Sequence, residues 1–372
     1  MKILFLATEL FNGTGGIKQF NNDFTKALLE MGHSVNVVSM NDNNIVDLFG
    51  FDYENFKFTS NSKSFRKIYF IKSVILKSFS FNPDIIICGH VNFSPVCLFV
   101  NKFLKIPYFT VTYGLDLWEI SKFRLLALKS SQAIVSISNY TKGLILKQLK
   151  DYSEKSIFIL PCAIDPDKFK PKVKPKYLMD RHKIKESDKV ILTVSRLSKY
   201  DKYKGYDNVI LAVKELIVDI PDVKYILGGF GDDIARIKNL IKCNELDDRV
   251  MLTGFISDAE LIDYYNLCDI FVMPSKREGF GIVFIEALAC GKPVIAGNKD
   301  GSVDALLNGK IGTLIDPDNV EEISQAILNI FTENTDSSLI NPKYLRNNVI
   351  ENFGFKKFKE KLNRIIEEYD VK

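Results

Sequence analysis

Short apolar segments alternate with helical patterns along most of the chain, and this alternation restricts the fold more than any other feature. Strands that are apolar on both faces belong to parallel sheets covered by helices on both sides. The sequence therefore predicts an α/β protein with two doubly wound, Rossmann-like units, whose ligands bind at the carboxyl ends of the strands. The ten predicted strands span residues 3–7, 35–39, 85–88, 107–111, 133–137, 190–195, 223–228, 250–253, 270–273 and 293–296.

A segment rich in proline and lysine separates the two series of strands. It includes Lys-Pro-Lys-Val-Lys-Pro-Lys at residues 170–176, a composition typical of an exposed linker. We therefore expect one Rossmann-like domain at residues 1–168 and a second at residues 169–352. An amphipathic helical pattern closes the chain within residues 353–372, which we treat as a separate segment.

Composition and charge indicate a globular protein. The hydrophobic share is 46% and the charged share is 26%, which suffices for a sizeable core. The net charge of +4 gives no reason to expect a nucleic-acid partner. No run of about 18 apolar residues predicts a membrane span, and the apolar start is interpreted as a buried strand instead of a secretory signal. We therefore expect a cytoplasmic location.

The stretch MPSKREGFGIVFIEALACG at residues 273–291 carries two glutamates eight positions apart, Glu278 and Glu286. A predicted strand leads into a glycine-rich loop, and a helical pattern then runs from Ile282 to a terminal glycine, Gly291. Glycines allow backbone N–H groups to approach a ligand closely, and a helix N-terminus supplies partial positive charge. We interpret the stretch as a strand–loop–helix unit that binds an anionic ligand.

The two glutamates are too far apart to act on one bond. If the whole span were helical, they would lie roughly 12 Å apart along the axis, which excludes a shared metal or an acid/base pair. They could hold hydroxyl groups at opposite ends of an elongated anionic ligand such as a nucleotide sugar. An ordinary βα unit with two surface glutamates is the alternative.

Basic residues follow the first predicted strand of the second series. Arg196 comes directly after this strand, and Lys204-Gly205 follow in the same loop. A guanidinium fork and a lysine point charge together suit a diphosphate group. Lys199 and Lys202 are rival candidates for the lysine role, and a solvated basic loop is the alternative interpretation.

The order of these motifs, together with the glycine-rich run at residues 228–232, resembles the retaining glycosyltransferases of family 4. Glu278 and Glu286 resemble the Glu-x7-Glu motif of that family. The resemblance spans essentially the whole chain. It implies the GT-B architecture, in which two Rossmann-like domains face a cleft and the C-terminal helix crosses back to the first domain. The second domain would bind a nucleotide-sugar donor, and the first would bind the acceptor.

The resemblance also implies roles for individual donor-side residues. Glu286 would hold the ribose hydroxyls, and Glu278 would hold the donor sugar. Arg196 and Lys204 would stabilise the diphosphate, so these two and Glu278 are catalytic candidates. The loop at residues 298–304 resembles a loop of a bacterial branch of the family. The other predicted donor-binding residues lie in glycine-rich or loop segments: Gly15, Gly16, Gly229, Phe255, Ile256, Gly279, Phe280, Gly281, Ile282 and Val283.

Strand ends of the first domain are expected to line the acceptor side. His90 follows the strand at residues 85–88 and is a further catalytic candidate, with a packed, hydrogen-bonded histidine as the alternative. Tyr113 and Asp116 follow the next strand and are the predicted acceptor-side residues. Many members of the family carry histidine where Tyr113 stands, so the resemblance transfers no catalytic role to that position.

Potential metal ligands lack the spacing of a metal site. Six cysteines are scattered without a CxxC pair, which indicates reduced, buried thiols. The three histidines show no zinc-ligand spacing. Asp-Pro-Asp occurs at residues 165–167 and 316–318, but its proline favours a turn over the Asp-x-Asp of a metal-dependent transferase. We therefore expect no required metal.

Basic and apolar residues are interleaved at residues 57–80. Between residues 57 and 115 there are eight basic residues and one acidic residue. A basic amphipathic helix of this kind can lie on an anionic membrane, as a lipid-linked acceptor would require. The alternative is a helix that packs its apolar side on the sheet and leaves its lysines in solvent. Contact with the inner face of the cell membrane is therefore one of two expected outcomes.

As a whole, the resemblance implies a retaining, metal-independent glycosyltransferase. It would move a sugar from a UDP- or GDP-sugar to a glycan or lipid-linked acceptor, in cell-envelope polysaccharide or lipopolysaccharide synthesis, with no cofactor besides this co-substrate. A nucleotide-sugar epimerase of the same architecture and a non-catalytic nucleotide-sugar-binding protein are the alternatives. An NAD-linked enzyme is a weaker one, because Gly13-x-Gly15-Gly16 lacks the final glycine of the dinucleotide fingerprint.

Overall fold

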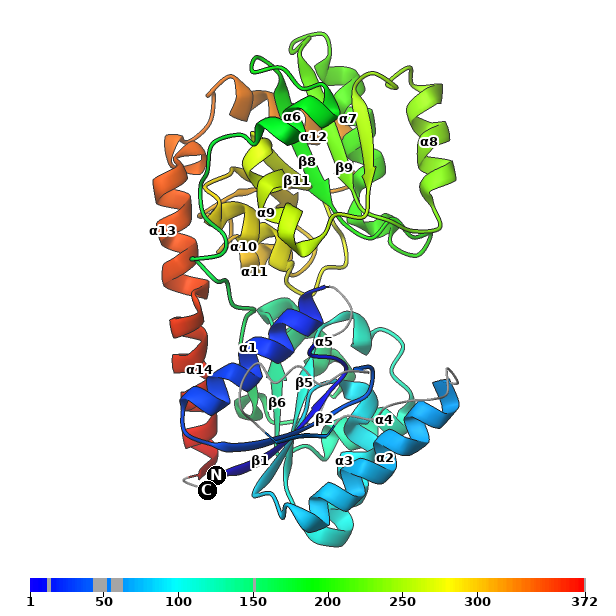
Figure 1. Cartoon of the computed structure of the whole chain (residues 1–372), viewed down its shortest axis with the longest axis vertical. Coiled ribbons are helices and arrows are strands. Elements are labelled where there is room, and N and C mark those ends of the chain that lie inside the picture. The colour runs from blue at the N-terminus through cyan, green and yellow to red at the C-terminus, as the bar shows by residue number, and fades with distance from the viewer. Residues whose placement is uncertain (12–14, 43–51, 55–62, 150–151, 371–372) are drawn as a thin grey trace. The chain divides into compact units, whose positions relative to one another are not determined.

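The computed structural model describes residues 1–11, 15–42, 52–54, 63–149 and 152–370 (Figure 1). The chain divides into two compact units. The first unit joins Met1–Ala163 to Phe355–Lys372, and the second is Ile164–Gly354. The first division therefore falls a few residues before the expected boundary after residue 168, and the second falls just after residue 352.

The first unit is built on a parallel sheet of seven strands in the order β3-β2-β1-β4-β5-β6-β7. The strands are β1 (Lys2–Ala7), β2 (Ser34–Ser39), β3 (Asp52–Glu54), β4 (Ile85–Cys88), β5 (Tyr108–Thr112), β6 (Ala133–Ser136) and β7 (Ile157–Ile159). The helices are α1 (Gly16–Glu30), α2 (Lys63–Ser80), α3 (Ser94–Leu104), α4 (Lys122–Lys129), α5 (Asn139–Gln148) and α14 (Phe355–Asp370), with 3-10 turns η1 (Val91–Phe93), η2 (Leu115–Leu117) and η3 (Glu154–Ser156).

The second unit is built on a parallel sheet of six strands in the order β10-β9-β8-β11-β12-β13. The strands are β8 (Lys189–Val194), β9 (Val223–Gly228), β10 (Val250–Gly254), β11 (Ile270–Met273), β12 (Val294–Gly297) and β13 (Thr313–Ile315). The helices are α6 (Lys176–His182), α7 (Tyr206–Leu216), α8 (Ile234–Cys243), α9 (Asp258–Leu267), α10 (Ile282–Ala289), α11 (Ser302–Ala305), α12 (Val320–Phe331) and α13 (Pro342–Phe353), with 3-10 turns η4 (Lys202–Lys204) and η5 (Ser337–Ile340).

The central strands are buried on both faces. Every residue of β4 and of β11 is buried, because helices cover both sides of each parallel sheet. Right-handed crossovers place α1 on one face of the first sheet and α2, α3 and α4 on the other (Figure 1). The predicted fold class, α/β with two doubly wound units, is confirmed.

Three short strands are missing from the sequence prediction, namely β3, β7 and β13. Each has three residues and lies at the edge of its sheet. Three residues are too few to show a strand pattern in the sequence, and pairing with the neighbouring strand decides their structure. The ten predicted strands agree with the structure to within one residue at each end.

The C-terminal helix α14 packs on α1 in the first unit. The ring of Phe358 lies 5.6 Å from that of Phe20 and 6.4 Å from that of Phe24, between centroids. Lys359 Nζ lies 2.7 Å from Glu30 Oε2. The expected return of the C-terminal helix to the first domain is confirmed, although the helix begins at Phe355 instead of residue 353.

Two expectations from composition can be compared with the structure. All six cysteines are among the described residues and are free thiols; five are buried, whereas Cys243 at the end of α8 is exposed. The expectation of buried thiols is thus wrong for Cys243, which lies on the solvent side of an amphipathic helix. Within the described part of the chain, no helix is long and apolar enough to cross a membrane.

Candidate functional site

Loops at the carboxyl ends of the second sheet touch backbone to backbone. Gly229, after β9, has a φ of +146°, a conformation that residues with a Cβ rarely adopt. A Cβ at this position would overlap the carbonyl oxygen of Ser195 in the loop after β8. A Cβ on Gly301, after β12, would overlap the carbonyl oxygen of Gly279 in the loop after β11. Most of the predicted site residues of this unit lie on loops at this edge of the sheet, whereas Ile282, Val283 and Glu286 lie on helix α10.

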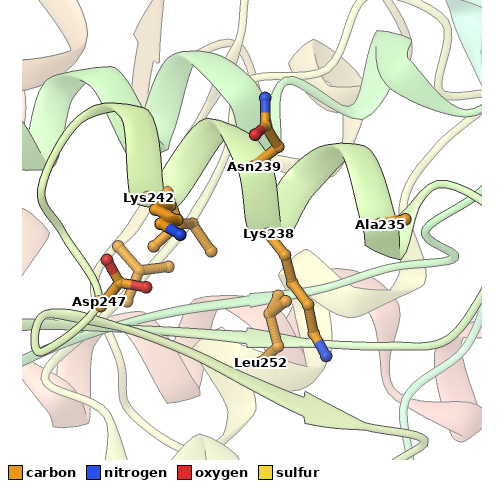
Figure 2. Close-up of a pocket in the computed structure, with 8 residues that line it drawn as sticks. Ala235, Lys238, Asn239, Lys242, Asp247 and Leu252 are labelled. Atoms are coloured by element: carbon orange, nitrogen blue, oxygen red, sulfur yellow. The ribbon is translucent and has the colours of Figure 1, made fainter.

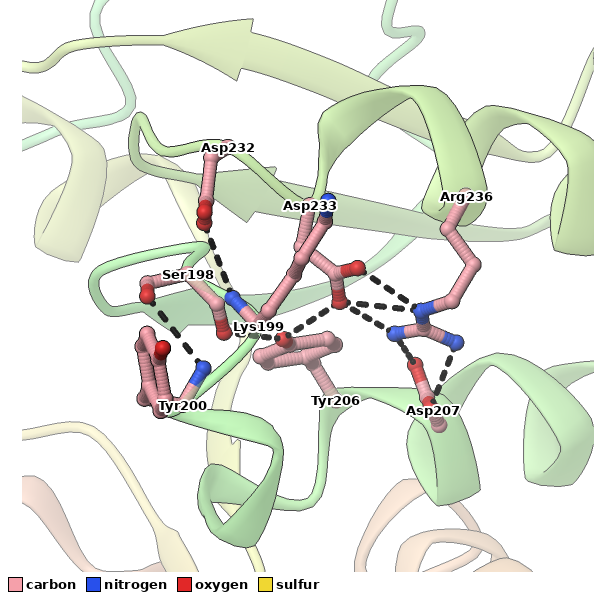
Figure 3. A network of polar contacts seen from close by, with 8 residues as sticks. All are labelled: Ser198, Lys199, Tyr200, Tyr206, Asp207, Asp232, Asp233 and Arg236. Carbon is pink, nitrogen blue, oxygen red and sulfur yellow. Dashed lines mark hydrogen bonds and ion pairs between the residues drawn. The ribbon is translucent and has the colours of Figure 1, made fainter.

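A network of hydrogen bonds and ion pairs connects the loop after β8 to the turn after β9 (Figure 3). The Lys199 backbone N–H donates to Asp232 Oδ1 at 2.9 Å. The Tyr206 hydroxyl donates to Asp233 Oδ2 at 3.2 Å, and Arg236 binds this carboxylate as well. Because these contacts come from two loops and two helices, they hold the loop that carries Arg196 and Lys204.

Arg196 is an exposed guanidinium held by a buried carboxylate. It follows β8 by two residues, and its side chain is 72% exposed. Its NH2 group lies 3.0 Å from Asp201 Oδ1, which also accepts a 2.9 Å hydrogen bond from the Tyr203 hydroxyl. Arg196 is thus oriented at the end of a central strand, where the fold leaves it accessible to an anion.

Lys204 and Glu278 form an ion pair between their Nζ and Oε1 atoms. Each side chain is only 14% exposed, and burial lowers the pKa of Lys204 to about 8. The rival candidates Lys199 and Lys202 are exposed. Of the three lysines in this loop, the structure therefore brings Lys204 to the predicted sugar-binding carboxylate.

The loop that carries Glu278 is held by Asp300, a buried residue after β12. Asp300 Oδ2 accepts from the Glu278 N–H at 2.6 Å and from the Ser275 hydroxyl at 2.8 Å, and its Oδ1 accepts from the Ser302 N–H at 2.9 Å. Burial raises the pKa of Asp300 to about 6. The sequence indicated the loop at residues 298–304 but gave no signal for Asp300 itself.

We expect the Asp300→Asn variant to loosen this loop. An amide has one acceptor atom, so at least one of the three donors would face its NH2 group. Losing a buried acceptor costs about 1–3 kcal/mol, and we expect a fall of that size in the free energy of unfolding and a raised donor KM. Denaturant unfolding and initial rates would measure both, with Asp219→Asn, an exposed residue after α7, as the control. Wild-type values of both the unfolding free energy and the KM would contradict the role of Asp300 in holding this loop.

Glu286 is a buried carboxylate on α10, only 7% exposed. The hydroxyl of Tyr265, on α9, donates to Glu286 Oε2 at 2.7 Å. Burial raises the pKa of Glu286 to about 7, although the Tyr265 hydrogen bond and the charge of Lys168 oppose this shift. Neither member of the Glu-x7-Glu pair is therefore a solvated surface glutamate. Tyr265 gave no signal in the sequence.

The N-terminus of α10 lies directly after the glycine-rich loop. Gly281 is the N-cap residue with a φ of +86°, and Ile282 and Val283 are the first two helical residues. The side chain of Phe280 is buried, with its ring centroid 5.3 Å from that of Phe353. Phe280 can therefore meet a ligand through its backbone, as the amide role requires.

The other predicted donor-binding residues lie in two places. Phe255 is exposed after β10, whereas the side chain of Ile256 is buried over Gly228. In the first unit, Gly15 is the N-cap residue of α1, with a φ of +118°, and Gly16 is the first helical residue. Gly13, part of the incomplete dinucleotide fingerprint, lies outside the described residues.

His90, Tyr113 and Asp116 cluster at the ends of β4 and β5 in the first unit. The ring centroids of His90 and Tyr113 are 6.0 Å apart, and the Tyr113 N–H donates to Asp116 Oδ1 at 3.0 Å. Burial lowers the pKa of His90 to about 4 and raises that of Asp116 to about 6. His90 Nδ1 accepts from the Asn92 N–H at 3.1 Å. His90 is thus neutral at pH 7 and carries its proton on Nε2.

Two further features bear on ligand binding. No group of three or more His, Cys, Asp or Glu residues in the described part of the chain could hold a metal ion. A hollow of about 550 Å³ lies between α8 and β10, lined by residues such as Lys238, Lys242 and Asp247 (Figure 2). None of the predicted site residues lines this hollow.

The chain is similar in sequence to several glycosyltransferases. A GDP-mannose-dependent alpha-(1-6)-phosphatidylinositol monomannoside mannosyltransferase of Mycolicibacterium smegmatis is 32% identical over 176 residues, 45% of each chain. An uncharacterized glycosyltransferase of Haemophilus influenzae is 25% identical over 84% of this chain and 86% of its own. The matches to the mannosyltransferase and to two further relatives cover 45–60% of those proteins' lengths.

Solved structures and family models agree with these relatives. Anabaena HepE in complex with UDP superposes with a TM-score of 0.82 over 99% of this chain and 100% of its own, at 19% identity. This likeness establishes a shared fold. Residues 14–168 match the model Glycosyltransferase Family 4, and residues 176–352 match Glycosyl transferases group 1. Two glycosyltransferase family models, one for each half, thus match most of the chain, and the chain has the GT-B fold.

Proposed function

We propose that this protein is a retaining, metal-independent glycosyltransferase that transfers a sugar from a UDP- or GDP-sugar to a glycan or lipid-linked acceptor. The observation that carries the proposal is the ion pair between Lys204 and Glu278 near the N-terminus of α10. It joins a cation suited to a diphosphate and a carboxylate suited to sugar hydroxyls. Matches to two glycosyltransferase family models, one for each half of the chain, support the reaction class.

On the donor side, the main contribution is stabilisation of charge. Negative charge grows on the leaving diphosphate, and Arg196, Lys204 and the first-turn amides of α10 supply positive charge. Arg196 is exposed, so it can turn from Asp201 to a phosphate. Glu286, oriented by Tyr265, holds the ribose hydroxyls, while Glu278 and the amides after it position the sugar.

On the acceptor side, the acceptor hydroxyl attacks the donor sugar from the same face as the departing diphosphate. The diphosphate takes the proton of this hydroxyl. The reaction needs no covalent nucleophile, because orientation and charge stabilisation lower the barrier. His90 is not the general base in this proposal, because its Nδ1 already accepts a hydrogen bond from the Asn92 N–H. Its role in this proposal is to donate a hydrogen bond from Nε2.

Names of relatives suggest the donor and acceptor classes. One curated relative is GDP-mannose-dependent and acts on a phosphatidylinositol monomannoside, and a structural neighbour was solved with UDP-glucose. We therefore propose UDP or GDP as the nucleotide. A lipid-linked or glycan acceptor in cell-envelope synthesis, used at the cytoplasmic face of the membrane, completes the proposal.

A ligand panel followed by a transfer assay tests the proposal. Purified protein is heated with UDP, GDP, ADP, dTDP, their common sugars and NAD. We expect one nucleoside diphosphate to raise Tm with increasing concentration, and its sugar to be consumed only with an acceptor. Donor conversion without acceptor would indicate an epimerase. Binding without transfer or hydrolysis would indicate a binding protein, and stabilisation by NAD alone would overturn the proposal.

Metal removal gives a further prediction. Because Arg196, Lys204 and the α10 amides neutralise the diphosphate, EDTA should leave the transfer rate unchanged. The rate would be measured before and after chelation, and again after adding Mn²⁺ or Mg²⁺. Loss of activity with EDTA that either ion restores would refute metal independence.

A further inference from the structure

The first unit carries an unusual density of exposed apolar side chains. Eighteen large hydrophobic residues of the described chain are exposed, and twelve of them lie between Phe65 and Leu126. This stretch makes up about one sixth of the chain. Single exposed apolar residues need no explanation, but a contiguous set marks an interaction site.

Helix α2 is apolar on two sides. Phe70 and Val74 are buried in a core cluster with residues of β1 and β4. On other sides of the helix, Phe65, Leu76 and Phe79 are exposed by 55–63%. The alternative interpretation from the sequence, a helix that packs its apolar side on the sheet, therefore explains one side of α2 and leaves the second without a partner among the described residues.

The exposed apolar residues continue onto two neighbouring helices. α3 contacts both α2 and α4, and all three contribute to the same core cluster on one face of the sheet (Figure 1). Phe103 on α3 and Phe123 on α4 are 70% and 60% exposed. We call the exposed sides of α2, α3 and α4 the α2–α4 face.

This face is also strongly basic. Residues 63–130 contain ten lysines and arginines and three acidic residues, a net charge of +7, whereas the whole chain carries +4. The rest of the chain is therefore net negative. Lys67 and Lys72 on α2, Lys102 on α3 and Lys122 on α4 are exposed beside the apolar residues.

The combination of lysines with large apolar residues favours a lipid partner over a protein partner. Cores of protein–protein interfaces are depleted of lysine. Lysine interleaved with phenylalanine and leucine is instead typical of helices that lie in a membrane interface, where long basic side chains reach the headgroups while apolar side chains enter the acyl region. Anionic headgroups complement the net charge of this segment.

We infer that the α2–α4 face docks on a lipid bilayer that carries anionic headgroups. The inference rests on the proposed function in one respect, the lipid-linked acceptor. His90 is the N-cap residue of η1, which leads directly into α3, and Asp116 lies in η2, which precedes α4. An acceptor headgroup at the membrane surface would thus meet the acceptor-side cluster at the ends of the helices that bind the bilayer.

Vesicle flotation tests the inference without donor or acceptor. The probes are vesicles of phosphatidylcholine alone and vesicles with about 30 mol% phosphatidylglycerol. We expect the full chain to float with the anionic vesicles, and less at about 1 M salt, where the Debye length falls to roughly 3 Å. The double variant Lys67→Glu/Lys72→Glu should weaken binding at least about tenfold, because each basic residue adds about 1 kcal/mol.

Two matched controls separate docking from general charge effects. Lys238→Glu/Lys242→Glu makes the same charge change on exposed positions of α8 in the other unit and should leave binding unchanged. Phe65→Ser/Phe79→Ser should weaken binding at low and high salt alike, whereas Val218→Ser after α7 should not. Thermal unfolding would confirm that each variant folds.

Three results would overturn the inference. These are no flotation of the wild-type chain with anionic vesicles, equal losses in the α2 and α8 variants, or a wild-type dimer that the α2 variants dissociate without any vesicle binding. The proposed function can be judged separately, because nucleotide binding by the soluble protein needs no vesicles. Vesicle binding without nucleotide binding would support membrane docking by the α2–α4 face and would refute the transferase proposal.

Discussion

Replacing Lys204 with alanine is expected to lower turnover by about 10²–10³-fold, the loss found when a charge-stabilising group is removed from an active site. Lys204 is largely buried against Glu278, so a ligand phosphate at this position would meet a desolvated ammonium group. Electrostatic stabilisation is stronger in such a place than in water. Arg196→Ala should give a loss of similar order, because its guanidinium would donate charged hydrogen bonds to the same diphosphate.

Controls in the same loop make this prediction specific. Lys199→Ala and Lys202→Ala remove the same charge from exposed positions and should leave turnover near the wild-type value. Steady-state rates with the identified donor would compare the four variants. Because Lys204→Ala leaves the Glu278 carboxylate without its cation, Lys204→Ala/Glu278→Gln should recover stability but not turnover. Near-wild-type rates in both Arg196→Ala and Lys204→Ala would end the diphosphate assignment.

The second large effect is expected at Glu286, where function and stability should change in opposite directions. A carboxylate that accepts ribose hydroxyls contributes about 1.5–3 kcal/mol through charged hydrogen bonds, so Glu286→Ala should weaken UDP or GDP binding about 10–100-fold. Isothermal titration would measure the affinity. Glu351→Gln on the exposed side of α13 serves as the control. An unchanged affinity would remove Glu286 from the ribose site.

Glu286→Gln should stabilise the unliganded protein at high pH. The pKa of Glu286 is about 7 in the folded state against 4.5 as the reference for an unfolded chain. A raised carboxyl pKa leaves the free energy of unfolding unchanged below pH 4.5. It lowers this free energy progressively as the pH rises from 4.5 to 7, and by a constant amount above pH 7. The constant loss of unfolding free energy above pH 7 amounts to roughly 3 kcal/mol. Denaturation at pH 5 and pH 8 should show the gain of the glutamine variant mainly at pH 8.

Much of the fold was predictable because its signals are local. Continuous apolar runs such as β4 and β11 show two-sided burial within four residues, and helix starts such as Gly281-Ile282 follow from glycine and periodicity over one or two turns. The edge strands β3, β7 and β13 had no such signal, because backbone pairing with a neighbouring strand makes them strands.

The candidate site was predictable in composition but not in its supporting contacts. The resemblance assigned roles to Lys204, Glu278 and Glu286, but Lys199 and Lys202 stayed rival candidates for the lysine role. Asp300 and Tyr265 were missed. An aspartate in a loop and a tyrosine in a helix are ordinary in sequence, and only burial beside Glu278 and Glu286 makes them positioning residues.

The amino-acid sequence by itself determined the two α/β halves, the order of the motifs and the basic, apolar character of residues 57–80, since all of these depend on neighbours along the chain. Only the tertiary structure decided which lysine meets Glu278, which carboxylate holds the loop, and which side of α2 remains exposed. Those outcomes depend on residues that lie far apart in sequence and are brought together by sheet pairing and helix packing. Burial at these contacts then sets the charges and pKa values on which the proposed chemistry depends.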